Sequence, residues 1–572
     1  MSPPTALRSR HRLALGRGEP ADLPIVQLGV KSIFGVPGDF NLAFLDQIDD
    51  HKDIEWVGCC NELNAAYAAD GYARVSKGLG VLVTTFGVGE LSALNGVAGA
   101  FSERVPVLHL VGVPSTVHQA HHAILHHTLG DGRFNVYLEC GAHVTIGQEM
   151  LMTADRASAQ IDKMLITALT TCRPTYLTLP TDLVFAKVST APLSRALTPS
   201  RIREALFTLP PPHSELAQLH DSAVSAVTKL CASAERPLIE HTGMTFFTTP
   251  MAKSVLDEDH ELFGGVYIGN ATIEPVKNAF EKADLVITVG LLMSDFNSGN
   301  FSFRLPAERT IELHSDMTKV GTEQYAGVTF FTMLPALIDA LPPKHELAVT
   351  ETPKDKVKAG IFASPPEGAP KDVITQDWFW PVFTRGVLKE GDILLGETGT
   401  SMFGLMDVHV PRRTMCLSQV LWGSIGWSVG ATLGAAVAAK ERGRRMVCFT
   451  GDGSVQVTVN DFSTMLRLGL KPVIVLLNND GYTIERFING PERHYNDIQP
   501  WKWATLLSTF GATPEQAAIH RIATPGELEA LLKRDDFGDG SKMEFVEVIL
   551  GKMDAPRLLK VQAELTHKFN LQ

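Results

Sequence analysis

The sequence of 572 residues lacks the cysteine patterns that hold small or zinc-stabilised folds together. Its seven cysteines are an odd number, and no two of them stand in a Cys-x-x-Cys pair. This argues against a disulfide framework and against a structural zinc site. Reduced thiols are typical of the cytosol, so we expect a cytoplasmic location.

Long apolar runs and clusters of positive charge are also missing. The best candidate for a membrane span, residues 81–101, contains Glu90, Asn95 and four glycines, which suits a buried α/β segment better. The formal net charge is −12, and Lys and Arg are scattered rather than gathered into a stripe. The composition therefore argues against a membrane and against nucleic acid as partners.

The first 24 residues have no acidic side chain before Glu19, but they carry four arginines, as some transit peptides do. Four prolines surround a short window that has no clear amphipathic stripe. We therefore interpret residues 1–24 as an irregular tail and keep organelle import as the alternative.

Strand-like apolar runs alternate with helical patterns along the rest of the chain. Such alternation predicts right-handed crossovers and parallel sheets with helices on both faces. The chain is also longer than one hydrophobic core usually serves. We expect an α/β protein with three doubly wound parallel-sheet domains, at residues 25–192, 200–341 and 372–572. A stretch rich in Pro, Lys and Glu at residues 342–371 predicts an extended linker.

Two strand-like runs in the third block end on polar side chains that suit one shared ligand. Asp452 lies in Gly-Asp-Gly before a helical pattern, where a phosphate can bind the free backbone N–H groups at a helix start. Asn479 follows 27 residues later, the length of one helix and one strand. Both side chains should therefore emerge at the carboxyl ends of neighbouring parallel strands. With the backbone carbonyl of Gly481, they suit a hard divalent ion completed by diphosphate oxygens.

This spacing resembles the signature of the thiamine diphosphate enzymes, in which Gly-Asp-Gly is followed at such a distance by Asn-Asn. The simpler alternative is a turn followed by a strand end, and no Gly-x-x-x-x-Gly-Lys-Ser/Thr segment supports a Walker-type nucleotide site. The likeness extends from Gln27 over nearly the whole chain. The segments that resemble 2-oxo-acid decarboxylases of the fungal pyruvate decarboxylase type are 35–41, 61–74, 126–130, 397–400, 418–426 and 478–485.

The resemblance implies a pyrimidine-binding, a central and a diphosphate-binding domain, with thiamine diphosphate and Mg²⁺ as cofactors. The implied magnesium ligands are Asp452, Asn479 and the Gly481 carbonyl. Ile425 would wedge the cofactor into a bent form. The other implied cofactor-binding residues are Thr398, Thr400, Gly423, Gly453 and Ser454.

The implied reaction is the non-oxidative decarboxylation of a 2-oxo acid, with pyruvate giving acetaldehyde and carbon dioxide through a thiamine-bound carbanion or enamine. Glu62 would hydrogen-bond the pyrimidine ring and promote its imino tautomer. Without the surrounding motif, Glu62 would be an ordinary glutamate at a helix start. Asp39 and Glu485 would be acids near the reacting carbonyl. Active sites of the family lie between subunits, so a homodimer or homotetramer is implied, with Glu62 and Glu485 meeting from different chains.

Five histidines fall between residues 118 and 127. His122 and His126 have the i, i+4 spacing of a helical zinc site, but no carboxylate or cysteine lies between them. The resemblance assigns the adjacent pair, His126 and His127, to proton transfer. On a helix their side chains would diverge by about 100°, so the two would play different roles.

Three alternatives stay open from the sequence. An indolepyruvate or phenylpyruvate decarboxylase would differ in pocket volume, which sequence order does not give, and a carboligase such as acetolactate synthase lacks the His-His pair. The third alternative is an inactive or assembly homologue, because the central domain is apparently shortened near residues 236–250. Only residues 240–244 separate two strand-like runs there, fewer than a parallel crossover needs. A missed exon boundary would explain the same gap.

Overall fold

The computed structural model describes residues 10–12, 24–189, 197–233, 245–341 and 366–571. Residues 342–365 of the predicted linker and 236–244 of the predicted shortening lie outside the described residues. In the N-terminal segment, β1 (Arg10–Arg12) pairs antiparallel with β8 (Lys187–Ser189), so the predicted irregular tail contains a strand. No described helix is long and apolar enough to cross a membrane.

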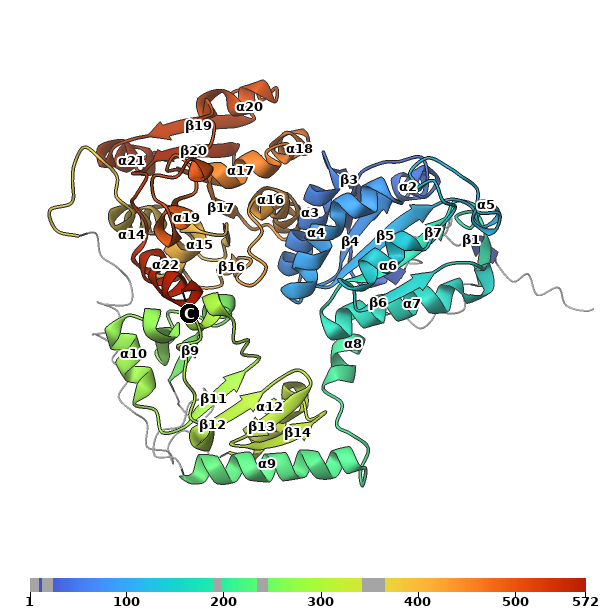
Figure 1. Cartoon of the computed structure of the whole chain (residues 1–572), viewed down its shortest axis with the longest axis horizontal. Helices are drawn as coiled ribbons and strands as arrows, with labels where there is room; N and C mark the ends of the chain where they lie inside the picture. The colour runs from blue at the N-terminus through green and yellow to red at the C-terminus, as the bar shows by residue number, and fades with distance from the viewer. Residues whose placement is uncertain (1–9, 13–23, 190–196, 234–244, 342–365, 572) are drawn as a thin grey trace, which may run out of the picture.

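The first domain is built on a six-stranded parallel sheet with helices on both faces (Figure 1). Its strand order is β3-β2-β4-β5-β7-β6. The strands are β2 (Ser32–Gly35), β3 (Glu55–Gly58), β4 (Gly80–Thr85), β5 (Val107–Val113), β6 (Gly147–Met150) and β7 (Thr175–Pro180). The helices are α1 (Pro24–Gln27), α2 (Leu42–Asp49), α3 (Glu62–Ser76), α4 (Val88–Ser102), α5 (Thr116–Ala120), α6 (Val136–Ala142) and α7 (Ala154–Thr171).

The third domain repeats this plan, with strand order β16-β15-β17-β18-β20-β19 and all pairs parallel. The strands are β15 (Ile393–Gly396), β16 (Met415–Leu417), β17 (Met446–Gly451), β18 (Val473–Asn478), β19 (Ala517–Ile522) and β20 (Met543–Ile549). The helices are α14 (Gln376–Val387), α15 (Thr400–Met406), α16 (Trp427–Glu441), α17 (Asp452–Thr458), α18 (Asp461–Arg467), α19 (Thr483–Ile488), α20 (Leu506–Thr509), α21 (Pro525–Leu532) and α22 (Arg557–Asn570). The predicted α/β class is confirmed.

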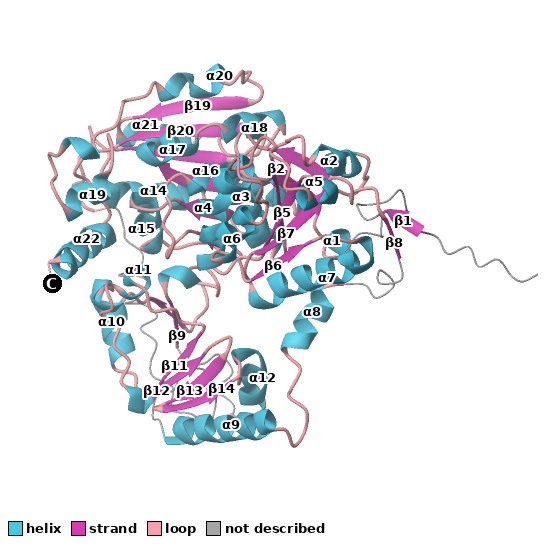
Figure 2. Cartoon of the chain, turned by 45° about the vertical axis from the view of Figure 1, so that its right-hand side comes forward, coloured by secondary structure: helices cyan, strands magenta, loops and turns pink. Residues whose placement is uncertain are grey.

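The central domain differs from the prediction because its main sheet is mixed (Figure 2). β9 (Phe246–Thr248) and β10 (Phe263–Val266) form a parallel pair, as do β11 (Val286–Val289) and β12 (Thr310–Leu313). β12, β13 (Met317–Val320) and β14 (Glu323–Ala326) are antiparallel. Their connections are only a few residues long, which fits hairpins and not crossovers. The helices are α8 (Pro199–Leu206), α9 (Glu215–Ser233), α10 (Glu274–Glu281), α11 (Asp295–Ser298) and α12 (Phe330–Ala340).

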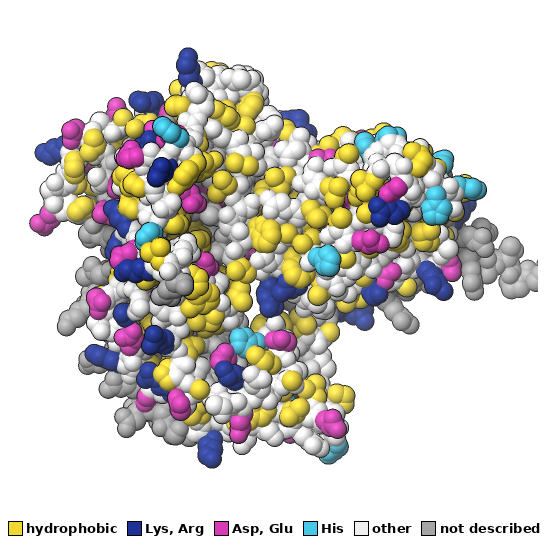
Figure 3. Space-filling model, viewed as in Figure 1, with side chains coloured by type: hydrophobic (Ala, Val, Ile, Leu, Met, Phe, Trp, Pro, Cys, Tyr) yellow, Lys and Arg dark blue, Asp and Glu magenta, His cyan; other side chains and the backbone are white. Residues whose placement is uncertain are grey.

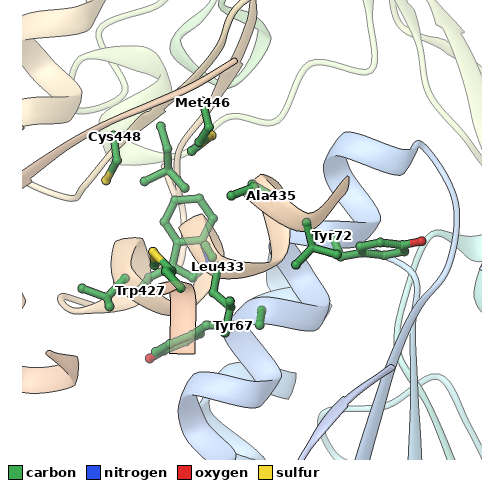
Figure 4. Packing of buried hydrophobic residues seen from close by; sticks show 14 of the residues in the cluster. Tyr67, Tyr72, Trp427, Leu433, Ala435, Met446 and Cys448 are labelled. Atoms are coloured by element: carbon green, nitrogen blue, oxygen red, sulfur yellow. The ribbon is translucent and has the colours of Figure 1, made fainter. Parts of the chain in front are cut away.

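The first and third domains meet where α3 crosses α16. A Cβ atom on Gly434 would lie 1.8 Å from the carbonyl oxygen of Ala68, so the backbones touch with no side chain between them. Around the crossing, Tyr67 and Tyr72 of α3 pack in one buried cluster with Trp427 of α16 (Figure 4). This contact fixes the start of α3 beside the third domain.

Candidate active site

Three oxygen atoms converge between the carboxyl ends of β17 and β18. The side-chain oxygen of Asn479 lies 3.1 Å from Oδ1 of Asp452 and 3.0 Å from the Gly481 carbonyl oxygen. The Asn479 nitrogen lies 2.8 Å from Oγ1 of Thr483. Turning the amide over would let its NH₂ donate to both oxygens. However, Thr483 Oγ1 already donates to the carbonyl of Lys552 and so can accept from the Asn479 NH₂. The Asn479 oxygen can therefore face the other two oxygens while its NH₂ donates to Thr483, an arrangement that a hard cation favours.

The backbone holds Asp452 firmly in this position. Asp452 begins α17 and is buried, and its carboxylate accepts hydrogen bonds from the N–H groups of Gly453 at 2.9 Å and Gly481 at 3.1 Å. Burial raises the pKa of Asp452 to about 6, against the lowering effect of those two hydrogen bonds. A positive ion beside the carboxylate would offset this cost of burial.

The loop after Asn479 is held by Arg486, which the sequence interpretation missed. Its guanidinium is fully buried and donates to the carbonyl oxygens of Pro491 at 2.8 Å and Asn496 at 3.0 Å, and to the carboxylate of Asp497 at 2.7 Å. Asp480 and Gly481 both have positive φ angles, of 58° and 115°. Arg486 therefore secures the turn that presents the Gly481 carbonyl.

The other cofactor-binding candidates border a loop held by a buried carboxylate. Glu397, at the end of β15, accepts hydrogen bonds from the N–H groups of Gly426 at 3.1 Å and Ser428 at 2.9 Å. Burial raises the pKa of Glu397 to about 7. Oγ1 of Thr398 is buried without a hydrogen-bond partner in the described part of the chain, and it faces Gly423.

The remaining candidates lie at this edge of the third sheet. Thr400 begins α15, and Gly453 and Ser454 are buried in the first turn of α17. Gly453 packs so closely on Tyr482 that a Cβ atom would lie 2.6 Å from its ring. Ile425 keeps 38% of its side chain exposed, as a residue that contacts a ligand or a second chain would.

Asp39, His126 and His127 form a second group, in the first domain. Nε2 of His126 lies 2.7 Å from Oδ2 of Asp39, and Nε2 of His127 lies 4.0 Å from Oδ1. The helical geometry expected for the two histidines is wrong, because both lie in a turn. His127 has φ of 67°, which turns its ring toward the same carboxylate as His126.

Three further residues keep His127 in this unusual conformation. The hydroxyl of Tyr137 donates to the His127 carbonyl at 2.7 Å. Gly87 packs against the same carbonyl, and its N–H donates to the buried carboxylate of Glu90 at 2.7 Å. Sequence reasoning could not find Tyr137 and Glu90 in this role because they depend on tertiary contacts.

Changing Glu90 to glutamine should flatten the pH dependence of stability. Burial raises the pKa of Glu90 from 4.5 to about 7, so the folded protein favours the protonated carboxyl. Stability is therefore lost as the pH rises from about 4.5 through about 7. Between about pH 5 and pH 8, the parent should lose about 3 kcal/mol relative to Glu90→Gln, measured by urea unfolding. Equal pH slopes for the two proteins would contradict this assignment.

Glu62 and Glu485 lie apart from these groups in different ways. Glu62 begins α3 half-buried, with a carboxylate oxygen 3.0 Å from where Gly89 would carry a Cβ, and burial raises its pKa. Nearby, the side chain of Asn64 donates to the carbonyl of Thr458 at 3.1 Å, which ties the start of α3 to α17. Glu485 is exposed on α19. Within the described ranges of this single chain, no hydrogen bond or ion pair joins Glu485 to Glu62 or Asp39.

Three family models match the chain. They are the thiamine pyrophosphate enzyme N-terminal TPP binding domain at residues 25–131, its central domain at 226–341 and its C-terminal TPP binding domain at 396–548. The chain is 44% identical over 564 residues to pyruvate decarboxylase isozyme 3 of Saccharomyces cerevisiae, covering 95% of this chain and 97% of the relative. It is also 44% identical to the pyruvate decarboxylases of Candida glabrata and Kluyveromyces marxianus, each with the same coverage.

Proposed function

Because the chain belongs to the thiamine pyrophosphate enzymes, in the family of the fungal pyruvate decarboxylases, we propose that it converts pyruvate to acetaldehyde and carbon dioxide. The observation that carries this proposal is the identity of 44% over 95% of the chain. The proximity of the Asp452 carboxylate and the Gly481 carbonyl oxygen to the side-chain amide of Asn479 adds geometric support. A cytoplasmic location remains an expectation from the sequence.

The residues at the carboxyl edge of the third sheet fit thiamine diphosphate held through Mg²⁺. Asp452, Asn479 and the Gly481 carbonyl would ligate the ion, and Gly453 and Ser454 would offer N–H groups at the start of α17 to the diphosphate. The hydroxyl of Thr398, which has no hydrogen-bond partner among the described residues, would supply a further polar contact. When bound, thiamine diphosphate supplies an electron sink for the electrons released as carbon dioxide leaves.

The acidic and imidazole side chains would move protons around that centre. Glu62 lies in a partly buried position that favours its protonated form, as needed for a hydrogen bond to a ring nitrogen. Asp39, His126 and His127 form a relay in which a proton on His126 Nε2 can pass to the carboxylate. Glu485 would complete the site from a neighbouring subunit.

An oligomer would cover the apolar surface beside the site. Trp422 is 42% exposed, and Val457, next to Gly426, is 49% exposed. Val88 at the start of α4 is 54% exposed. Figure 3 shows hydrophobic side chains gathered along the junction of the first and third domains. We propose that a second copy packs here as a homodimer, alone or within a homotetramer, and brings Glu485 to Glu62.

The activity is tested with purified protein, Mg²⁺ and thiamine diphosphate. We expect pyruvate to give carbon dioxide and acetaldehyde. The acetaldehyde is measured in a coupled assay, with an alcohol dehydrogenase that consumes it. Pyruvate should give a higher kcat/KM than indolepyruvate or phenylpyruvate. A higher kcat/KM for indolepyruvate or phenylpyruvate would show that the bulky acid, and not pyruvate, is the preferred substrate. Folded protein that binds cofactor but releases no carbon dioxide would indicate an inactive homologue.

A further inference from the structure

Asp39, His126 and His127, which we assign to proton transfer, also have the side-chain types that bind metal ions. One carboxylate and two imidazoles each present one ligand atom, and these atoms all lie within 4.8 Å of one another. The three side chains are exposed or half-buried, so an ion can reach them from solvent. Two imidazoles and a carboxylate form a ligand set typical of zinc sites that keep a fourth position open.

We propose that Asp39, His126 and His127 form a reversible Zn²⁺ site, distinct from the magnesium site on the third domain. In a tetrahedral site with bonds of about 2.0 Å, neighbouring ligand atoms lie about 3.3 Å apart. Nε2 of His126 lies 2.7 Å from Oδ2 of Asp39, and Nε2 of His127 lies 4.0 Å from Oδ1 of the same carboxylate. With one ligand atom from each side chain, all three atoms lie within 4.8 Å of one another, so the side chains need to close by at most about 1.5 Å.

The surroundings hold the two imidazoles near this geometry. The ring of Phe40 lies 5.1 Å from the His126 ring and 6.3 Å from the His127 ring, measured between centroids. Phe86 packs against His127 at 5.9 Å. The left-handed backbone of His127, secured by Tyr137, keeps both imidazoles on one carboxylate. His126 and His127 therefore lie close enough together to bind one ion, as the spacing of His122 and His126 had suggested for a different pair.

His122 lies outside this group of three. Its Nδ1 lies 3.0 Å from the carbonyl of Gly132. Among the described residues, no hydrogen bond holds Nδ1 of His126 or His127. The site thus lacks the outer shell that tightens structural zinc sites, and we expect exchangeable binding in the micromolar range.

Zinc binding would replace the direct contact between His126 and Asp39 on which the proposed proton transfer depends. The ion takes the place of the hydrogen between His126 Nε2 and Asp39, and the neutral imidazole then carries its N–H proton on Nδ1. Bound zinc should therefore inhibit decarboxylation, an effect that rests on the proposed function. Zinc binding itself does not depend on decarboxylase activity, so the experiments can refute the zinc site and the proposed function separately.

The test is calorimetric titration of Zn²⁺ into protein saturated with Mg²⁺ and thiamine diphosphate, so that the magnesium site is filled. We expect His127→Ala and Asp39→Ala each to weaken zinc binding by about tenfold or more. His122→Ala and Cys60→Ser are matched controls, because they remove a neighbouring imidazole and an exposed thiol, and they should bind zinc like the parent. Co²⁺ bound in place of zinc should show the visible absorption of a tetrahedral site in the parent and not in His127→Ala.

The outcomes separate cleanly. Loss of binding in His127→Ala and Asp39→Ala alone supports the site. Equal binding in all four variants, loss of binding in Cys60→Ser or His122→Ala, or no binding of micromolar zinc to the parent overturns it. Circular dichroism of each variant shows that the fold is intact.

Discussion

Asp452→Ala is expected to lose Mg²⁺-dependent binding of thiamine diphosphate, with an affinity at least about 100-fold below that of the parent. The carboxylate is buried at the start of α17 and is the one formal negative charge among the three converging oxygens. Without it, the ion loses its anionic protein ligand and the diphosphate charge is less well balanced. Removing one charge from a buried pair costs about 3 kcal/mol or more, which corresponds to a factor of about 100.

The measurement is a calorimetric titration of cofactor at saturating Mg²⁺, for the parent, Asp452→Ala and Asp480→Asn. Asp480 lies in the adjoining loop but is exposed, so its variant removes the same charge without removing a ligand. Asp480→Asn should bind within a few-fold of the parent. Cofactor affinity unchanged in Asp452→Ala would refute the metal assignment, whatever the activity of the variant.

Glu62→Gln should fold and bind cofactor like the parent but lose about 100-fold to 10,000-fold in kcat. Glutamine keeps the size of the side chain and can still hydrogen-bond, but it cannot give up and regain the proton that drives tautomerisation of the pyrimidine. Glu62 is partly buried at the start of α3, which the hydrogen bond from Asn64 to Thr458 ties to α17.

The direct probe for Glu62 is hydrogen–deuterium exchange at C2 of the bound thiazolium, quenched with acid and read by NMR. Exchange should slow in Glu62→Gln and remain fast in Glu55→Gln, which changes an exposed glutamate of β3. Parent-like exchange in Glu62→Gln would show that another group activates the cofactor. Lost cofactor binding would instead indicate a binding role.

The metal and diphosphate site could be predicted because its residues stand next to sequence patterns that indicate strands. Asp452 and Asn479 each follow a run of apolar residues, and neighbouring parallel strands bring such positions together whatever the rest of the chain does. The start of α3 was predictable for a similar reason. Asn61 caps it through a hydrogen bond to the N–H of Asn64 at 2.8 Å, a contact within one turn.

The features that the sequence did not predict depend on contacts that a sequence pattern does not show. Nothing near His127 in the sequence indicates a left-handed backbone, since Tyr137 and Gly87 impose it from other elements. The buried role of Arg486 likewise emerges only when residues 480–497 fold back over it. The hairpins of the central domain were missed because their short strands carry the same β-branched residues as parallel ones.

The crossing of α3 and α16 has a consequence for building chimaeras between relatives. Gly71 would place a Cβ 2.1 Å from the Ala431 carbonyl, and Gly434 would place one 1.8 Å from that of Ala68, so each helix is shaped to the bare backbone of the other. Importing the first domain of a homologue with alanine at residue 71 would push the helices apart and move Glu62 away from α17. The unit to transfer is therefore the pair of helices, although about 350 residues separate them in the sequence.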